Sequence, residues 1–592
     1  MANQGMPPQA SGPVVNAPTV VRLGSPRKRI RVFTILLLIF ILASILRLVD
    51  LQIIRGPELA AQAENSRLQT FVVPALRGQI TDLNGIPIAM SVKAKDVTVD
   101  QTLVRDAHKT AVILAPYLKM SVKKIQTRLT GKLRFNYVAK NITPELWDKI
   151  EKLHLVGIFS QPTSSRIYPE GGLAASLLGF TGFDGSGLVG LEQKYNDILA
   201  GKDGKQTVEM VNGAQIPTGP NSGNDAVDGG SIKLTIDHSI QAVAERALAR
   251  QVKAQHAFGG DVVVMDPKTF QILAMATYPT YNPNHPEKYS ADQQRNSSVQ
   301  NIFEPGSTSK IMTMAAVIEE GALKPTSKLV IPPFIRKGGT NFHDHEPHGT
   351  LHLTLNGVLA QSSNIGSIIA SEKIGQDKFL DYLRKFGVGQ LTGSNIYGEQ
   401  SGKLPDPKNE NEWSDTTFPT LAFGQGLSVT ALQVASIYST IANNGVRLTP
   451  QILAGTTNNE GVYTPADPPT ATRVVSSKTA RTIREMLESV VSADGTAPAA
   501  QIPGYRVAGK TGTAQYSGGN RKGYSGYTAS FVGMAPAENP SLVIAVMIHT
   551  PGGLHFGSLL SGPVFREVMM YSLAHRKVPP SSRKRPQIAV KW

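Results

Sequence analysis

Three short segments carry side chains that together could perform acyl transfer. In chain order they are Ser307-Thr308-Ser309-Lys310, Ser362-Ser363-Asn364 and Lys510-Thr511-Gly512-Thr513. A serine hydroxyl is a poor nucleophile and needs a base within hydrogen-bonding reach. A lysine that is partly desolvated and close to a second cation can lose its proton near neutral pH. We therefore predict that Ser307 is the nucleophile and Lys310 its base, with the lysine of the third segment as the second cation.

The spacing within the first segment predicts a buried helix. Ser307 and Lys310 are three residues apart in the sequence, so they share one face of a helix. Pro305-Gly306 precedes them, as expected where a helix starts, and an apolar, helix-forming run follows over 311–323. Ser-x-x-Lys occurs elsewhere in the chain, but only this copy is followed by an apolar helical run and by the other two segments.

The second segment places polar side chains between apolar residues. Ser362 and Asn364 follow Leu359-Ala360 and precede a mostly apolar run over 365–369, so we expect them in a cleft or in the interior, where they need partners. A hydroxyl there can relay a proton to a leaving group, and an amide can hold both a substrate carbonyl and the Lys310 amine. The alternative is that these residues cap a helix.

The third segment is predicted to be a strand that contains a glycine. It follows Tyr505–Ala508, and a glycine in a strand marks the close approach of another backbone or of a ligand. The Lys510 ammonium and the Thr511 and Thr513 hydroxyls form a site for a substrate carboxylate. The backbone N–H of Thr513, paired with that of Ser307, could form an oxyanion hole.

The elements that must position these segments predict an α/β (α+β) domain with an antiparallel sheet flanked by helices. A strand, a helix and a hairpin open this domain, a long helical section follows, and a second hairpin closes it. The predicted elements are a strand at 231–236, a helix at 239–257, paired strands at 261–265 and 272–276, and paired strands at 527–534 and 541–548.

Residues 52–230 are predicted to be a separate, non-catalytic module. Glycine, proline and asparagine punctuate this region, and its sequence contains no catalytic constellation. Asn84-Gly85 between apolar runs predicts a hairpin, and 141–154 predicts a helix capped by Thr143. The polar, glycine-rich stretch 221–230 is the expected boundary with the catalytic domain.

An apolar stretch near the N-terminus predicts a membrane anchor. The run Val32–Leu46 carries no charge, and Arg31 and Arg47 at its ends could extend to the two interfaces, which brings the span close to the ~20 residues that cross a bilayer. The basic cluster at 27–31 is expected to stay in the cytoplasm, which places the chain after residue 51 outside. A cleaved signal peptide and a buried core helix are the alternatives.

Charge and composition exclude several other classes. Most of the net charge of +16 lies in the basic, acid-free terminal segments 1–31 and 568–592, and no stripe of basic and aromatic residues suits nucleic acid. We expect both terminal segments to be solvated and flexible. The absence of cysteine excludes a disulfide scaffold, a thiol nucleophile and a cysteine-based zinc site.

One cluster of residues has the types of metal ligands. It consists of His343, Asp344, His345, Glu346 and His348. The loop-like setting and the proline within it favour a solvated or structural turn, with a metal site as the alternative. No cofactor and no metal are expected for the reaction.

In their order and context the three segments closely resemble those of class B penicillin-binding proteins. The resemblance covers roughly residues 30–570 and includes five further stretches. These are RGQITDLNG at 77–85, RIYPEGGLAASLLGF at 166–180, GLVGLE at 187–192, LTID at 234–237 and FGQGLSVTALQ at 423–433. The chain length, KTGTAQ and YTASFVGMAP are most similar to the division-specific (septal) peptidoglycan D,D-transpeptidases.

This resemblance implies a transpeptidase domain with the penicillin-binding/serine β-lactamase-like fold. Ser307 would attack the D-Ala-D-Ala bond of a peptidoglycan stem peptide with Lys310 as its base. Ser362 and Asn364 would assist, and the segment Lys510 to Thr513 would bind the terminal carboxylate. The amino group of a neighbouring stem peptide would then resolve the acyl-enzyme into a crosslink, and β-lactams would acylate the same serine.

The resemblance also implies partners and a location. The partners would be a lipid-II-polymerising membrane glycosyltransferase and other division proteins, and the chain would cross the cytoplasmic (inner) membrane once with its catalytic domain periplasmic or extracytoplasmic. The expected domains are a cytoplasmic tail at 1–31, a transmembrane anchor at 32–51, a non-catalytic pedestal or dimerisation-type domain at 52–230, a transpeptidase domain at 231–575 and a basic C-terminal tail at 576–592.

Four other functions stay open at this point. A lateral-wall (elongation) transpeptidase of the same family would carry the same three segments. A membrane β-lactam-binding sensor would also need a cytoplasmic output domain, and a β-lactamase or carboxypeptidase would need a way to deliver water to the acyl-enzyme. A scaffold without activity would not need Ser307.

Overall fold

The chain forms two compact units. The first comprises residues up to 71 together with 205–224, and the second comprises 72–204 and 225–592. The computed structural model describes residues 26–211, 214–215, 221–516, 526–550 and 556–592. Of the predicted cytoplasmic tail 1–31, residues 1–25 therefore lie outside the described part.

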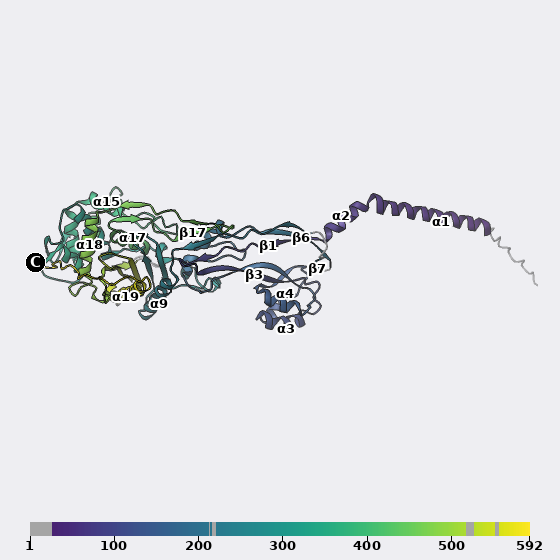
Figure 1. The fold of residues 1–592 in the computed structure, drawn as a ribbon, viewed down its shortest axis with the longest axis horizontal. Helices are drawn as coiled ribbons and strands as arrows, with labels where there is room; N and C mark the ends of the chain where they lie inside the picture. Colours follow the sequence, from purple (N-terminus) through teal and green to yellow (C-terminus); the bar gives the residue numbers. More distant parts are fainter. Residues whose placement is uncertain (1–25, 212–213, 216–220, 517–525, 551–555) are drawn as a thin grey trace, which may run out of the picture. The chain divides into compact units, whose positions relative to one another are not determined.

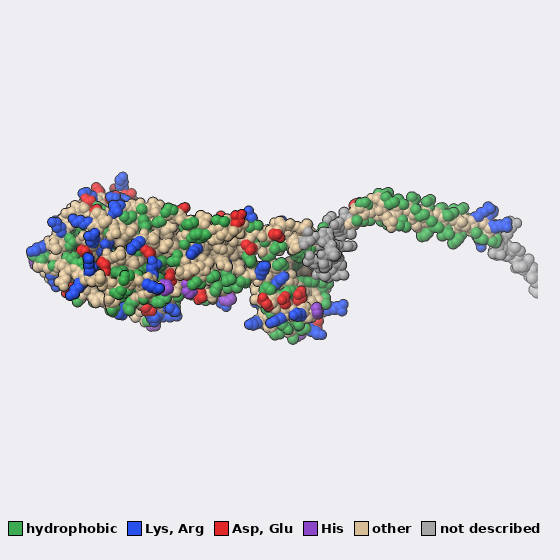
Figure 2. All heavy atoms as spheres, in the orientation of Figure 1, with side chains coloured by type: hydrophobic (Ala, Val, Ile, Leu, Met, Phe, Trp, Pro, Cys, Tyr) green, Lys and Arg blue, Asp and Glu red, His purple; other side chains and the backbone are tan. Residues whose placement is uncertain are grey.

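The first unit contains the apolar N-terminal helix. α1 (Pro26–Val49) continues as a π-helical turn, η1 (Asp50–Ile54), and together they are long and apolar enough to cross a membrane. Figure 2 shows hydrophobic side chains along α1 and basic side chains at its N-terminal end. None of the α1 residues is buried, so the alternative of a core helix is wrong.

A second helix and a small sheet complete the first unit. The helix is α2 (Gly56–Arg67), and the strands are β1 (Leu68–Val73), β6 (Gly204–Val211), β7 (Ala214–Gln215) and β8 (Asn221–Asn224). β8 pairs with β6 in antiparallel fashion. The start of the predicted linker at 221–230 is therefore a strand, because its backbone groups find partners in β6.

The central element of the second unit is a five-stranded antiparallel sheet in the order β11–β10–β22–β21–β20. Its strands are β10 (Gly259–Met265), β11 (Ile272–Tyr278), β20 (Ala508–Tyr516), β21 (Gly526–Ala535) and β22 (Leu542–Thr550). Both predicted hairpins are confirmed, and they join because β10 pairs with β22.

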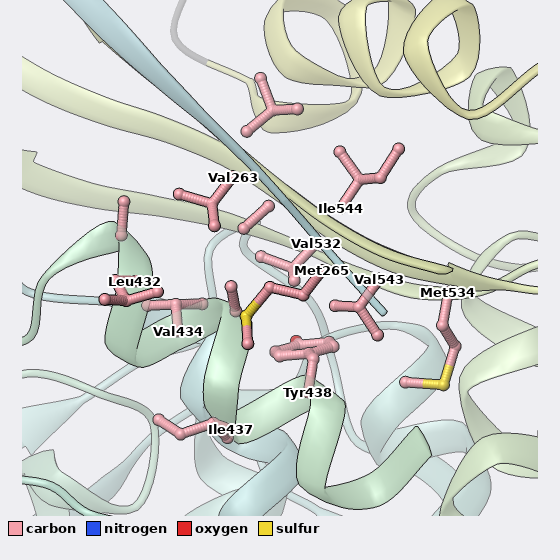
Figure 3. Packing of buried hydrophobic residues seen from close by; sticks show 14 of the residues in the cluster. Val263, Met265, Leu432, Val434, Ile437, Tyr438, Val532, Met534, Val543 and Ile544 are labelled. Carbon is pink, nitrogen blue, oxygen red and sulfur yellow. The ribbon is translucent and has the colours of Figure 1, made fainter. Parts of the chain in front are cut away.

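Helices cover the sheet, which confirms the predicted fold class. α9 (His238–Ala254) and α19 (Gly557–His575) pack side by side against it, as Figure 1 shows. α17 (Ala431–Ala442) is buried throughout and lies on the other side of the strands in Figure 3, where Met265 and Val543 lie close to the ring of Tyr438. The predicted helical section between the hairpins contains α12 (Lys310–Glu319), α13 (Leu355–Ala360), α14 (Asn364–Glu372), α15 (Gln376–Lys385) and α18 (Ser477–Val490).

A seven-stranded sheet of the second unit joins strands that are far apart in the sequence. β9 (Ser231–Leu234) runs parallel to β2 (Ile80–Thr81) and antiparallel to β17 (Leu453–Thr457). The strand predicted at 231–236 is thus confirmed, but it does not join the five-stranded sheet that the two predicted hairpins form. Its apolar pattern specifies a strand and does not specify which edge the strand joins.

The same sheet continues into a small subdomain with its own apolar core. Its elements are β3 (Pro87–Val99), β4 (Asn136–Ile142), β5 (Ile158–Ile167), α3 (Ala107–Leu118), α4 (Val122–Leu129) and α5 (Pro144–Glu151). The Asn84-Gly85 hairpin is confirmed as the turn between β2 and β3, and Thr143 caps α5 by accepting a hydrogen bond from the Leu146 N–H. The division into domains at 52–230 and 231–575 stays a prediction.

A buried ion cluster ties together three of the stretches that carried the family resemblance. Arg77 Nε lies 2.6 Å from one carboxylate oxygen of Glu192, and Arg166 Nε lies 2.8 Å from the other. Tyr168 donates a further hydrogen bond to this carboxylate over 3.1 Å. The Glu192 side chain has no exposed surface, so its charge depends entirely on these partners.

The last residues of the chain pack against the catalytic domain. Thr354 N–H donates to the Val590 carbonyl, Asn356 Nδ2 donates to the Ile588 carbonyl, and the Trp592 indole donates to the carbonyls of Leu329 and Leu353. The expectation of a solvated, flexible terminal segment at 568–592 is therefore wrong for these residues. It is also wrong for 568–575, which form the end of α19 and bury Val568, Met569 and Leu573. The backbone groups beside β15 (Leu351–Thr354) provide the partners, which composition alone does not indicate.

We predict that Glu192→Ala lowers the free energy of unfolding by about 3–5 kcal/mol, because it leaves two buried guanidinium groups without their anion. Thermal unfolding of the detergent-solubilised protein measures this change. The control is Glu567→Ala, which removes the exposed partner of Arg250 and should change the melting temperature little. Equal melting temperatures for both variants would contradict the prediction.

Candidate active site

The predicted nucleophile, Ser307, lies in a tight turn at the start of a buried helix. Ser307 belongs to a 3-10 turn over Gly306–Ser309, and α12 begins at Lys310. Side chains three residues apart eclipse in a 3-10 turn, so Ser307 and Lys310 project from the same side. The residues from Lys310 to Val317 are buried, as predicted.

Two other elements hold this turn in place. The Tyr438 hydroxyl on α17 donates to the Thr308 carbonyl over 2.9 Å, and the Thr313 hydroxyl donates to the Ala422 carbonyl over 2.8 Å. Burial raises the pKa of Tyr438 well above its usual value, so this hydroxyl stays a donor. The turn that carries Ser307 therefore rests directly on the core helix of the domain.

Ser362 occupies the junction between α13 and α14 in a left-handed conformation. Its φ of 61° is uncommon for a residue with a side chain, and such conformations are found where function requires them. Ser363, and not Ser362 or Asn364, caps α14, because its hydroxyl accepts from the Gly366 N–H over 2.9 Å. The helix-cap alternative is thus correct only for the middle residue of the segment.

The strand predicted for the third segment is confirmed as β20. A Cβ added at Gly512 would lie 2.4 Å from Ser530 Oγ and 3.0 Å from the Pro305 carbonyl oxygen. Gly512 is therefore the point at which the strand meets the nucleophile turn, which confirms that this glycine marks a close approach. Gly306 faces the strand in return, since a Cβ there would lie 3.1 Å from the Thr513 carbonyl oxygen.

The two lysines meet at the hydroxyl of Ser362. Lys310 Nζ donates to the Ser362 carbonyl at 2.5 Å, to Asn364 Oδ1 at 2.8 Å and to Ser362 Oγ at 3.3 Å. Lys510 Nζ donates to the same Oγ at 2.9 Å. Within the described part of the chain, no hydrogen bond joins Ser307 to Lys310, and catalytic hydrogen bonds often form only when substrate is bound.

Burial changes the proton affinity of both lysines. Neither side chain has exposed surface. Burial lowers the pKa of Lys310 to about 7, and the charge of Asp344 opposes this shift. The pKa of Lys510 also lies well below its usual value, mainly because the side chain is buried and to a lesser extent because the charge of Lys310 is close by. Lys310 can thus be neutral near pH 7, as a general base must be.

The three segments line one cleft with a volume of about 650 Å³. Ser307, Ser362, Asn364, Thr511 and Thr513 all contribute to its wall. The Thr511 hydroxyl forms a hydrogen bond of 2.8 Å with the hydroxyl of Thr496. Thr496 also lines the cleft. It belongs to no sequence motif, so only the folded structure identifies it as a neighbour of β20.

The histidine-rich loop does not gather its side chains around one point. His345 packs edge-on against Phe556, His343 lies against Phe334, and His348 Nε2 lies 3.1 Å from Asp344. Among the described residues, no group of three or more histidine, aspartate or glutamate side chains is arranged to hold a metal ion. The loop instead forms part of the cleft wall. Asp344 belongs to this wall, although the sequence suggested it only as a possible metal ligand.

Comparisons with known proteins give consistent matches over most of the chain. The family model described as Penicillin binding protein transpeptidase domain matches residues 260–570, and that described as Penicillin-binding Protein dimerisation domain matches residues 72–234. Penicillin-binding protein PbpB of Mycolicibacterium smegmatis is 36% identical, with 94% of this chain and 91% of the relative covered. Peptidoglycan D,D-transpeptidase FtsI of Escherichia coli is 33% identical, with 90% of each chain covered.

Solved structures are similar over most of the chain. Penicillin binding protein 3 from Mycobacterium tuberculosis, complexed with aztreonam, has a TM-score of 0.69 and 32% identity, and the match covers 88% of this chain and all of that one. A peptidoglycan synthetase from Bifidobacterium adolescentis has a TM-score of 0.71 and 30% identity, with 89% of this chain covered and all of that one.

We predict that Ser362→Ala slows acylation by a fluorescent penicillin on the order of 10²-fold, because it removes the hydroxyl that both lysines share. The rate of label incorporation into the solubilised protein measures this loss. Ser371→Ala is the control, since the Ser371 hydroxyl bonds only within its own helix to the Ile368 carbonyl. A wild-type rate for Ser362→Ala would show that the shared hydroxyl has no part in acylation.

Proposed function

The chain belongs to the family of penicillin-binding transpeptidases, and from this premise we propose that it is a septal peptidoglycan D,D-transpeptidase that works through an acyl-enzyme on Ser307. The observation that supports this role for Ser307 is the buried pair of lysines bonded to Ser362 on the wall of the same cleft. A buried lysine pair has no evident structural use, because each buried charge destabilises the fold.

The acylation step follows from this arrangement. Ser307 Oγ attacks the carbonyl carbon of the bond between the two terminal D-alanines, and its proton passes to the neutral Nζ of Lys310. The backbone N–H groups of Ser307 and Thr513 stabilise the oxyanion. The C–N bond then breaks, and the leaving D-alanine amine takes a proton through the Ser362 hydroxyl.

Substrate binding and the second half of the reaction use the other residues of the cleft. The hydroxyls of Thr511 and Thr513, with the charge of Lys510 behind them, bind the terminal carboxylate. Asn364 orients the amide of the stem peptide. The amino group of a second stem peptide then attacks the ester carbonyl and loses a proton to Lys310. As the ester C–O bond breaks, Lys310 returns this proton to Ser307 Oγ, and the new amide bond is the peptide crosslink.

β-Lactams act on this enzyme as substrate mimics. Their strained amide takes the place of the D-Ala-D-Ala bond, and Ser307 opens it to a stable ester. Penicillin binding protein 3 from Mycobacterium tuberculosis has been solved in complex with aztreonam and with ampicillin. The role of Ser307 in this chain rests on its position in the cleft beside the lysines.

We further propose a septal role, a membrane topology and partners for this protein. The apolar helix α1 with basic residues at its N-terminal end favours a single-pass anchor with that end in the cytoplasm. The catalytic unit would then lie outside the membrane, where peptidoglycan is. A lipid-II-polymerising glycosyltransferase and other division proteins would supply and direct its substrate.

We predict that a fluorescent penicillin labels the wild-type protein stably and does not label Ser307→Ala. Denaturing electrophoresis of the detergent-solubilised protein measures this label. Rapid loss of the wild-type label would favour a β-lactamase, and equal labelling of both proteins would exclude Ser307 as the nucleophile. In its own host, replacement by Ser307→Ala should block septation, whereas loss of cell shape with normal septation would favour the lateral-wall alternative.

A further inference from the structure

The loop before β15 fixes the start of α14 through one carboxylate. Asp344 Oδ1 accepts hydrogen bonds from the backbone N–H groups of Asn364 at 2.5 Å and Ile365 at 2.9 Å. Its Oδ2 accepts from the Ser363 hydroxyl at 2.7 Å. One side chain, from a loop about twenty residues earlier in the chain, therefore bonds to three consecutive residues, of which Ser363 and Asn364 belong to the second catalytic segment.

Neighbouring groups of the same loop complete this clamp. His348 Nε2 lies 3.1 Å from Asp344 Oδ2, and the His343 carbonyl accepts from Asn364 Nδ2 at 3.2 Å. The amide of Asn364 thus has its oxygen on Lys310 and its nitrogen on the loop. The side chain of Asp344 is only 9% exposed, so its negative charge acts through protein and little through water.

This carboxylate also acts electrostatically on the base. Among the described residues, the charge that changes the pKa of Lys310 is that of Asp344 on the loop, and the charge of Lys310 in turn lowers the pKa of Lys510 on β20. The charge of Asp344 raises the pKa of Lys310 and so opposes the effect of burial. Asp344, which lies outside the three sequence motifs, therefore influences both the position of the groups around Lys310 and the pKa of Lys310.

We propose that Asp344, held by His348, is a positioning residue of the transpeptidase reaction that aligns Ser362 and Asn364 on Lys310. Helix capping alone does not account for it, because Ser363 already caps α14. The inference rests on the proposed function, since it assigns Asp344 a role in the acylation of Ser307.

The variant Asp344→Asn tests this role in the full-length protein. The substitution keeps the size of the side chain and removes its negative charge. It also replaces one of the two acceptor oxygens by an NH₂ group, which cannot accept a hydrogen bond from the Ser363 hydroxyl. We expect the maximal rate of acylation by a penicillin to fall on the order of 10²-fold, because the catalytic groups lose their alignment. Without the negative charge the protonated form of Lys310 is less stable, so the acid limb of the pH–rate profile should move to lower pH.

Two further variants separate charge from geometry. Ser363→Ala loses the hydrogen bond to Asp344 and the cap of α14 but keeps the charge of Asp344, so its rate should fall while the acid limb stays at the wild-type pH. If Asp344→Asn does not fold, as judged by thermal unfolding, a wild-type rate for Ser363→Ala would overturn the inference, because the bond between Ser363 and Asp344 would then have no part in the alignment. Asp377→Asn is the matched control, because it removes an exposed carboxylate from the first turn of the next helix and should leave the profile unchanged.

The outcomes distinguish the two proposals. A lower rate for Asp344→Asn with the acid limb shifted to lower pH supports the inference. A wild-type profile, or a lower rate with an unmoved acid limb, would overturn it, because the second result is that of a merely structural residue. Failure of the wild-type protein to be acylated at any pH would instead overturn the proposed function on which the inference rests.

Discussion

The active site depends on the burial of two lysine side chains around one serine hydroxyl. Lys310 and Lys510 come from a helix and from a sheet strand, and both donate to Ser362 Oγ. Removal of an ammonium group from water costs several kcal/mol unless the group is paired or loses its proton. Among the described residues, Asp344 on a neighbouring loop is the one anion that stabilises the protonated form of Lys310. Proton loss near neutrality therefore relieves part of this cost, and the same proton loss makes a base.

The rest of the fold keeps these groups in a geometry that they would not adopt by themselves. Two cations repel each other, and Ser362 holds a left-handed backbone conformation. The antiparallel sheet holds Lys510 in register through β21, and Tyr438 on the core helix supports the turn that carries Ser307. A well-packed core on both sides of the sheet therefore stabilises a site that is unfavourable locally.

The sequence predicted what depends on local chemistry and missed what depends on distant backbone pairing. The serine and lysine of the first segment, the glycine of the third and both hairpins follow from residue type and periodicity. The edge that β9 joins, the packing of the C-terminal residues and the contact of Asp344 with α14 depend on partners that no local pattern specifies. Asp344 was visible in the sequence only by type, as one of several candidate metal ligands, and no local pattern indicated its contacts with α14.

The most direct test of the buried base is the rate of acylation of the wild-type, detergent-solubilised protein by a penicillin as a function of pH. If Lys310 takes the proton from Ser307, only its neutral form is active. We therefore expect the rate to fall as the pH drops through about 7, approaching a tenfold loss for each further pH unit. A rate that stays constant from roughly pH 5 to pH 8 would contradict a buried lysine base.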